Sequence, residues 1–156
     1  MSDNPLLTPS TLPYGAPDFS RIRPEHYPPA FKEAVRQKRE EIQKIVDNKA
    51  TPTFQNTIVA FEHSGQLLDR ISSVFFCITE ADGTPEIEAA EKEVIPMLTD
   101  LSNEIMLNQK FFQRVKYVYS HERASLKGED LKLLDVGGKG VLLPFGAHKG
   151  YAFELI

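Results

Sequence analysis

The chain has 156 residues, a length that suits one domain with a buried core. Its composition, with 41% hydrophobic and 26% charged residues, is ordinary for a globular protein and argues against global disorder. The formal net charge of −4 argues against a general nucleic-acid-binding protein, because such proteins normally carry a basic surface.

The cellular compartment is indicated by what the sequence lacks. The single cysteine, Cys77, stands in the apolar run SSVFFCIT, so no internal disulfide can form and a reducing compartment fits. We expect Cys77 to be a small core residue. The N-terminus has no basic segment followed by an apolar one, and no apolar run approaches the roughly 20 residues that span a bilayer. The expectation is a soluble, cytoplasmic protein with no membrane partner.

Residues 1–24 form a proline-rich arm that contains five of the eleven prolines. Proline fixes φ and has no N–H, so the arm is predicted to be extended rather than helical. Apolar side chains recur along it, and we expect them to dock on a surface. They are Leu6, Leu7, Leu12, Tyr14 and Phe19.

Helical periodicity begins at residue 24 and continues to residue 136. Residues 24–48 predict a first helix, and 48–82 predict a break followed by one long helix with Thr53 as its N-cap. A third helix is predicted over 82–108, with Thr84 as N-cap, Pro85 in the first turn and a kink at Pro96. A fourth is predicted over 109–125 and a fifth over 127–136. The fold class is therefore all-α, an antiparallel helix bundle.

No catalytic, metal-binding or cofactor-binding residue is predicted in this helical part. The sequence HERAS at 121–125 contains a His-Glu pair, but Ser125 stands where a zinc peptidase motif needs its second histidine. His121 is interpreted as a solvated residue near a helix end. His63 is followed by Ser64, and neighbouring residues on a helix point apart, so the two cannot form a catalytic pair.

The last twenty residues differ in composition and are rich in glycine. The segments GGKG at 137–140 and GAHKG at 146–150 match neither the P-loop nor the dinucleotide-binding pattern. Glycine-rich turns before a helix can still hold an anion through backbone N–H groups. We expect a short irregular or β-like tail.

Three segments carry a resemblance to a known family: NPLLTPSTLPYGAPDF in the arm, FQNTIVAFEHSGQLLDRISSVFF at 54–76 and LNQKFFQRV at 107–115. Over about residues 4–136 the chain resembles the N-terminal region of bacterial peptidyl-dipeptidases (dipeptidyl carboxypeptidases). These are zinc metallopeptidases similar to thimet oligopeptidase.

The resemblance implies a large, nearly all-helical, clam-shaped enzyme that releases C-terminal dipeptides from oligopeptides. Its one zinc is held by an HExxH helix and a downstream glutamate, several hundred residues beyond the matched region. The N-terminal helices of such an enzyme form part of one wall and restrict access to the cleft. No catalytic residue or zinc ligand is therefore carried over to this chain.

The tail resembles a different family over about 20 residues, namely a segment of the malate/L-lactate dehydrogenases, which use NAD(P). In that family His148 and Lys149 would lie at the start of a helix near the cofactor region. A piece of this size without its domain could not bind a dinucleotide. The expected organisation is an arm over 1–24, a helical metallopeptidase domain over 25–136 and a tail of different origin over 137–156.

Three hypotheses of function follow. The favoured one is an N-terminal fragment of a peptidase for oligopeptides that is catalytically incomplete on its own. The second is a helical module that binds peptides or proteins, or associates with itself, through exposed apolar helix faces. The third, and least favoured, is an oxidoreductase role through the tail.

Overall fold

The computed structural model describes residues 4–81, 83–128 and 130–131. Its α-helices are α1 (Tyr27–Asp47), α2 (Ala60–Glu62), α3 (Gln66–Ala81), α4 (Pro85–Met106) and α5 (Gln109–Glu122). A π-helical turn, η3 (Phe54–Val59), precedes α2, and 3-10 turns lie at Pro13–Gly15, Pro24–His26 and Arg123–Ser125. These described residues contain no strand, so the all-α prediction is confirmed.

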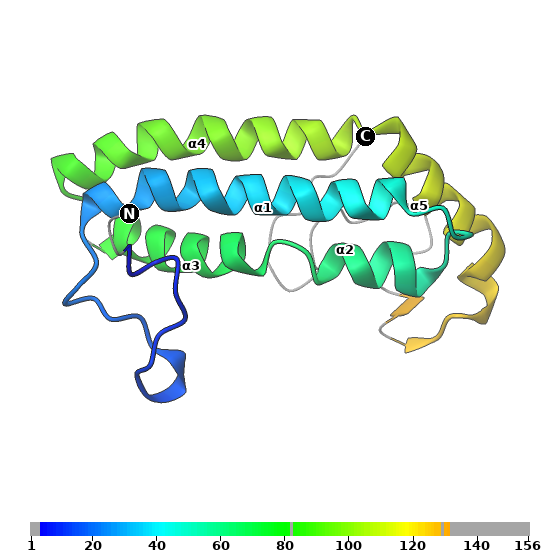
Figure 1. Cartoon of the computed structure of the whole chain (residues 1–156), viewed down its shortest axis with the longest axis horizontal. Coiled ribbons are helices and arrows are strands. Elements are labelled where there is room, and N and C mark those ends of the chain that lie inside the picture. The colour runs from blue at the N-terminus through cyan, green and yellow to red at the C-terminus, as the bar shows by residue number, and fades with distance from the viewer. Residues whose placement is uncertain (1–3, 82, 129, 132–156) are drawn as a thin grey trace. The chain divides into compact units, whose positions relative to one another are not determined.

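The described residues fall into two compact units. The first unit holds residues 4–41 and 65–104, with residue 82 outside the description, and the second holds 42–64 with the part from 105 onward. In the first unit α3 runs antiparallel to both α1 and α4, as the colours of Figure 1 show. An exposed pair joins α1 to α4, where the Arg39 guanidinium donates to both carboxylate oxygens of Glu104 at 2.6 and 2.8 Å.

The core of the first unit is formed by the apolar stripes of its three helices. Phe75 of α3 lies at its centre, with ring centroids 4.8 Å from Tyr27 and 5.3 Å from Phe31, both on α1. Ile71 and Val94 are fully buried beside these rings. Burial raises the pKa of Tyr27 to about 12, with a smaller contribution from the Cys77 thiol. The Tyr27 hydroxyl has no hydrogen-bond partner among the described residues.

In the second unit α5 packs against η3 and α2. Phe61 and Phe111 form its central ring contact, with centroids 5.0 Å apart. Arg114 of α5 is buried, with only 8% of its surface exposed. Its guanidinium donates to the carbonyl oxygens of Asn48 at 2.8 Å and Ala50 at 3.4 Å, and to a side-chain oxygen in η3 at 3.0 Å. This arginine therefore binds the 48–56 segment to α5.

The prediction of one long helix after Thr53 is wrong in one respect. Thr53 is the N-cap as predicted, since its side chain accepts from the Asn56 N–H at 3.1 Å. The helical path is then interrupted between α2 and α3, where Gly65 has a φ of +78°. The Gly65 N–H donates to the Glu41 carboxylate at 2.6 Å instead of continuing the helix. A side chain from α1 thus stabilises the break.

The third and fourth predicted helices correspond to α4 and α5. The Thr84 hydroxyl accepts a long hydrogen bond from the Ile87 N–H at 3.4 Å, and Asn108 caps α5 by accepting from Phe111 at 2.9 Å. Helix α4 continues through Pro96, which is exposed. The fifth predicted helix lies largely, and the glycine-rich tail wholly, outside the described residues.

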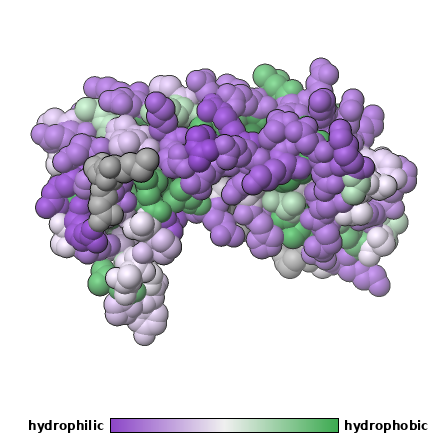
Figure 2. Space-filling model, viewed as in Figure 1, coloured by the Kyte–Doolittle hydropathy of each residue, from purple (hydrophilic) through white to green (hydrophobic). Residues whose placement is uncertain are grey.

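The arm contains turns and no α-helix in its described part, residues 4–24. Leu6 docks as expected, with 5% of its surface exposed. The expectation of docking is wrong for the other four apolar residues, because Leu7, Leu12, Tyr14 and Phe19 are all exposed. In Figure 2 hydrophilic side chains cover much of the helical part of the visible face. No helix in the described residues is both long and apolar enough to cross a membrane.

Candidate functional site

The histidines of the described residues are not part of a larger cluster of metal-binding side chains. No group of three or more His, Cys, Asp or Glu residues close enough to hold a metal ion occurs in the described part of the chain. His121 is exposed at the end of α5, where its ring stacks on Tyr117 with centroids 4.0 Å apart. Its Nδ1 lies 2.8 Å from the Tyr117 carbonyl oxygen. Ser125 follows in an exposed 3-10 turn.

His63 and Ser64 differ in exposure. His63 is exposed, whereas Ser64 is buried and its hydroxyl donates to the Phe61 carbonyl oxygen at 2.5 Å. That hydroxyl stabilises the end of α2. The structure does not bring the imidazole and the hydroxyl together as a nucleophile and base.

The expectation that Cys77 is a core residue is wrong, because the side chain is exposed on α3. The buried positions of this helix are Ile71, Val74 and Phe75, and a residue two positions beyond Phe75 is turned by about 200° around the helix axis. The apolar run SSVFFCIT therefore does not mark a continuous buried segment. His148 and Lys149 lie outside the described residues.

A cavity of about 260 Å³ lies between the arm and α3. It belongs entirely to the first unit, and its apolar lining comes from Leu6 and Ile22 of the arm and from Ile71 and Val74 of α3. Other arm residues, including Leu12, three prolines and the hydroxyl-bearing Thr8, Ser10 and Thr11, also line it, together with three charged side chains. The charged ones are Asp18, Arg21 and Arg70.

The arm is held around this cavity by hydrogen bonds near its start. The Asn4 side chain donates to the His26 carbonyl oxygen at 2.8 Å and accepts from the Leu6 N–H at 3.0 Å. The Arg70 guanidinium of α3 donates to the Leu6 carbonyl oxygen at 3.1 Å. On the far side of the cavity, Asp18 accepts from the N–H and the hydroxyl of Ser20 at 3.2 and 2.6 Å.

Sequence reasoning did not identify this cavity. Its polar groups come from residues 8–21 of the arm and from Arg70 of α3, two segments more than 40 residues apart that share no spacing a motif could capture. The prolines of the arm were the only signal, since they predict a non-helical segment that must run over some surface.

Comparison with known proteins shows that the chain is similar to part of several bacterial peptidases. No protein-family model matches it. Dipeptidyl carboxypeptidase of Salmonella typhimurium is 48% identical to it over 137 residues, which cover 87% of this chain and 20% of that protein. The Escherichia coli dipeptidyl carboxypeptidase is 44% identical over 134 residues, or 85% of this chain and 20% of that protein. This chain is a relative of the dipeptidyl carboxypeptidases.

Oligopeptidase A of Escherichia coli is a more distant relative, 28% identical over 154 residues that cover 95% of this chain and 22% of that protein. The chain thus spans about a fifth of the length of these relatives, and the match lies in their N-terminal part. The family resemblance seen in the arm, the 54–76 segment and the 107–115 segment is confirmed.

Proposed function

We propose that this chain forms the N-terminal helical part of a zinc metallopeptidase that releases dipeptides from the C-terminal end of oligopeptides in the cytoplasm. The observation that carries the proposal is the 48% identity with a dipeptidyl carboxypeptidase over 137 residues. Identity at this level over most of a chain is strong support for a shared fold, while activity must be argued from a site.

The contribution of this part to the peptidase is structural. The 156 residues contain no HExxH sequence, and the described residues contain no cluster of metal-type ligands. In a complete enzyme the zinc would polarise the scissile carbonyl and activate water, and its ligands would come from elsewhere in the protein. The packed helices α1, α3 and α4 supply a rigid surface that could restrict access to a cleft.

An activity assay on the 156-residue chain tests the absence of catalysis. We expect no release of dipeptide from an N-blocked tripeptide, with or without added zinc, and no stoichiometric zinc after dialysis. The full-length Salmonella typhimurium dipeptidyl carboxypeptidase is the positive control in the same buffer. Dipeptide release by the chain at enzyme-like rates, abolished by a chelator, would contradict the proposal.

A chimera tests the structural role directly. Residues 4–136 of this chain would replace the matching N-terminal part of the Salmonella typhimurium dipeptidyl carboxypeptidase. We expect the chimera to fold and to release dipeptides at a rate within about tenfold of the parent enzyme, because the replaced part holds no zinc ligand. A chimera that folds, as judged by its circular dichroism, and binds zinc but has lost activity more than a hundredfold would refute a purely structural role.

The organisation of the chain near residue 137 is a further part of the proposal. We propose that residues 137–156 have a different origin from the helical part and do not bind NAD(P). Addition of NADH is expected to change neither the cofactor fluorescence nor the melting temperature of the chain. The nucleotide sequence beyond the last codon tests the junction, because an HExxH-encoding continuation in another frame would indicate an interrupted peptidase gene.

The second hypothesis, a helical interaction module, is favoured by one observation in the second unit. Leu107 and Phe112 expose 79% and 63% of their surfaces, and Met106 and Tyr117 are also exposed. Exposed apolar residues that together form one contiguous patch are typical of interaction surfaces. Sedimentation of the isolated chain between about 5 and 200 μM would detect self-association. If Leu107→Ser with Phe112→Ser leaves any observed association unchanged, this surface is not responsible.

A further inference from the structure

The cavity beneath the arm combines an apolar wall with the guanidinium of Arg70 on α3. Ile71 is fully buried behind it, and Leu6 and Val74 are also buried. Two guanidinium groups and one carboxylate line the same space. Pockets that bind small molecules commonly have this composition, an apolar lining with a few polar groups that fix the orientation of the ligand.

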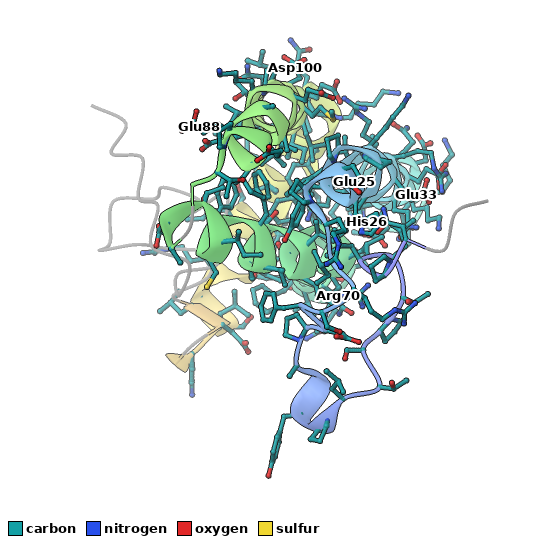
Figure 3. All side chains as sticks on the ribbon, turned by 90° about the vertical axis from the view of Figure 1, so that its left-hand side faces the viewer. Glu25, His26, Glu33, Arg70, Glu88 and Asp100 are labelled. Carbon is teal, nitrogen blue, oxygen red and sulfur yellow. The ribbon has the colours of Figure 1, made fainter. Side chains whose placement is uncertain are left out.

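Arg70 favours an anionic ligand. It is exposed, and one of its Nη atoms donates to the neutral carbonyl of Leu6. A guanidinium has five N–H donors in a planar fork and binds carboxylates through two of them at once. The carboxylate of Asp18 accepts two hydrogen bonds from Ser20. Figure 3 shows Arg70 on the side of α3 that faces the arm.

We propose that this cavity binds a small carboxylate that carries an apolar group, which is the chemistry of the last residue of a peptide. The carboxylate would pair with Arg70, and the apolar group would lie against the accessible apolar side chains of the lining, Leu12, Ile22 and Val74. A volume of about 260 Å³ is slightly below the range of drug-sized pockets, which limits the ligand to one or two residues. A medium-chain fatty acid shares this chemistry, and the experiment distinguishes the two sources.

Calorimetric titration of the 156-residue chain tests the site. The three probes are N-acetyl-alanyl-leucine, the same dipeptide with a C-terminal amide, and octanoate. We expect the dipeptide acid to bind with a Kd on the order of 1 mM, the range in which a ligand of this size gains about 4 kcal/mol. The amide should bind at least tenfold more weakly, because it has no charge to pair with Arg70.

Two variants assign the site to its residues. Arg70→Gln should weaken binding of the acid at least tenfold. Arg36→Gln on α1 makes the same charge change outside the cavity, where Arg36 pairs with Glu33 and Glu40, and should leave binding unchanged. Leu12→Asp places a negative charge in the cavity lining at an exposed position of the arm and should also weaken binding if Arg70→Gln unfolds.

Each outcome decides the proposal. Preference for the acid over the amide, lost in Arg70→Gln or Leu12→Asp and kept in Arg36→Gln, supports it. Tighter binding of octanoate than of the dipeptide acid also supports a carboxylate site and identifies the fatty acid as its source. Equal affinity for acid and amide, equal effects of the two arginine substitutions, or no heat from either acid at 10 mM would overturn it.

Discussion

The turn at Gly65 offers a sharp test of how α1 determines the path of the chain. Gly65 has a φ of +78°, its N–H donates to the Glu41 carboxylate, and its carbonyl oxygen accepts from the Asp69 N–H in the first turn of α3 at 2.9 Å. We predict that Gly65→Ala is strongly destabilising. Two separate costs contribute, one from the backbone and one from a neighbouring side chain.

The backbone cost arises because a residue with a Cβ is strained at this φ, by about 1–2 kcal/mol. The packing cost arises from Lys38 of α1. An added Cβ at Gly65 would lie 2.6 Å from Lys38 Cδ and 3.0 Å from its Nζ, far inside van der Waals contact. Lys38 is only 8% exposed, so it has little space into which to move. Overpacking of this kind costs about 1–3 kcal/mol, so the total expected loss is about 2–5 kcal/mol.

A double-mutant cycle with Lys38→Ala separates the two costs. Guanidinium unfolding followed by circular dichroism at 222 nm would give the free energy of unfolding of each variant. In the Lys38→Ala background, Gly65→Ala should cost only the backbone strain of about 1–2 kcal/mol. A coupling energy of at least about 1 kcal/mol is therefore expected between the two positions.

Two other glycines provide matched controls. Gly15 has a φ of +68° but open space around an added Cβ, so Gly15→Ala should show the backbone cost alone. Gly83 lacks a positive φ and its added Cβ would lie 3.6 Å from the Thr79 carbonyl oxygen, so Gly83→Ala should be nearly neutral. The reasoning is refuted if Gly65→Ala is no more destabilising than Gly15→Ala, or if Lys38→Ala leaves its cost unchanged.

Three further predictions concern charged and titrating groups. Arg114→Met should lower the free energy of unfolding by about 2–3 kcal/mol and raise hydrogen exchange in the 48–56 segment, because charge-assisted hydrogen bonds to that segment are lost. Arg114→Lys should be destabilised as well, since an ammonium lacks the planar set of donors of a guanidinium. An Arg114→Met variant with wild-type stability and wild-type exchange would contradict this prediction. The raised pKa of Tyr27, about 12, means that stability present below pH 10 is lost as the pH rises from about 10 to 12. The free energy of unfolding, measured by denaturation at about pH 10 and about pH 12, should be lower at the higher pH. The difference between the two pH values should be smaller in Tyr27→Phe, which has no hydroxyl to titrate at this position. Glu33 should titrate at a pKa of about 2 by NMR, because Arg36 donates hydrogen bonds to its carboxylate, and Arg36→Met should raise this pKa. The ionised Glu33 stabilises the fold above about pH 4.5, and this stabilisation is lost as the pH falls toward 2. The effect should be small because the pair is exposed.

The helices were predicted correctly where a continuous apolar stripe of helical period runs along the segment. α1, α4 and α5 follow from the 3.6-residue period, and Thr53 from its capping chemistry. The break at Gly65 was missed because a glycine inside a helical pattern is usually tolerated. What makes it a break here is Glu41, a partner 24 residues earlier whose position no local pattern reveals.

The faces of Cys77 and of the arm were predicted less well for a related reason. An apolar run gives the composition of a segment, whereas burial depends on which neighbour packs against it. Leu6 is buried because hydrogen bonds to Asn4 and from Arg70 hold it against α3. Leu12, further along the arm, hydrogen-bonds to Ser10 and Gly15 within the arm itself and is exposed.

The family could be predicted from the sequence, whereas the candidate site could not, because the site depends on contacts between segments that are distant in sequence. The family follows from short segments that are each contiguous in sequence, so the resemblance can be read directly. The cavity needs Arg70 and Asp18, which only the folded arm brings to one space. A ligand site assembled from two distant segments leaves no spacing in the sequence.

Polar contacts between distant segments determine the parts of this fold that the apolar pattern leaves undetermined. Apolar stripes are sufficient to form helices and to bury one face of each, but they do not determine where a helix ends or how a loop returns. The Glu41 carboxylate fixes the start of α3, the Arg70 guanidinium fixes the arm, and the Arg114 guanidinium fixes the 48–56 segment. Loss of one such contact should therefore loosen its own segment before it unfolds the helices, since the buried apolar faces remain in place. Of the three losses, only that of the Arg70 contact should therefore affect the cavity beneath the arm, because neither Glu41 nor Arg114 lines it.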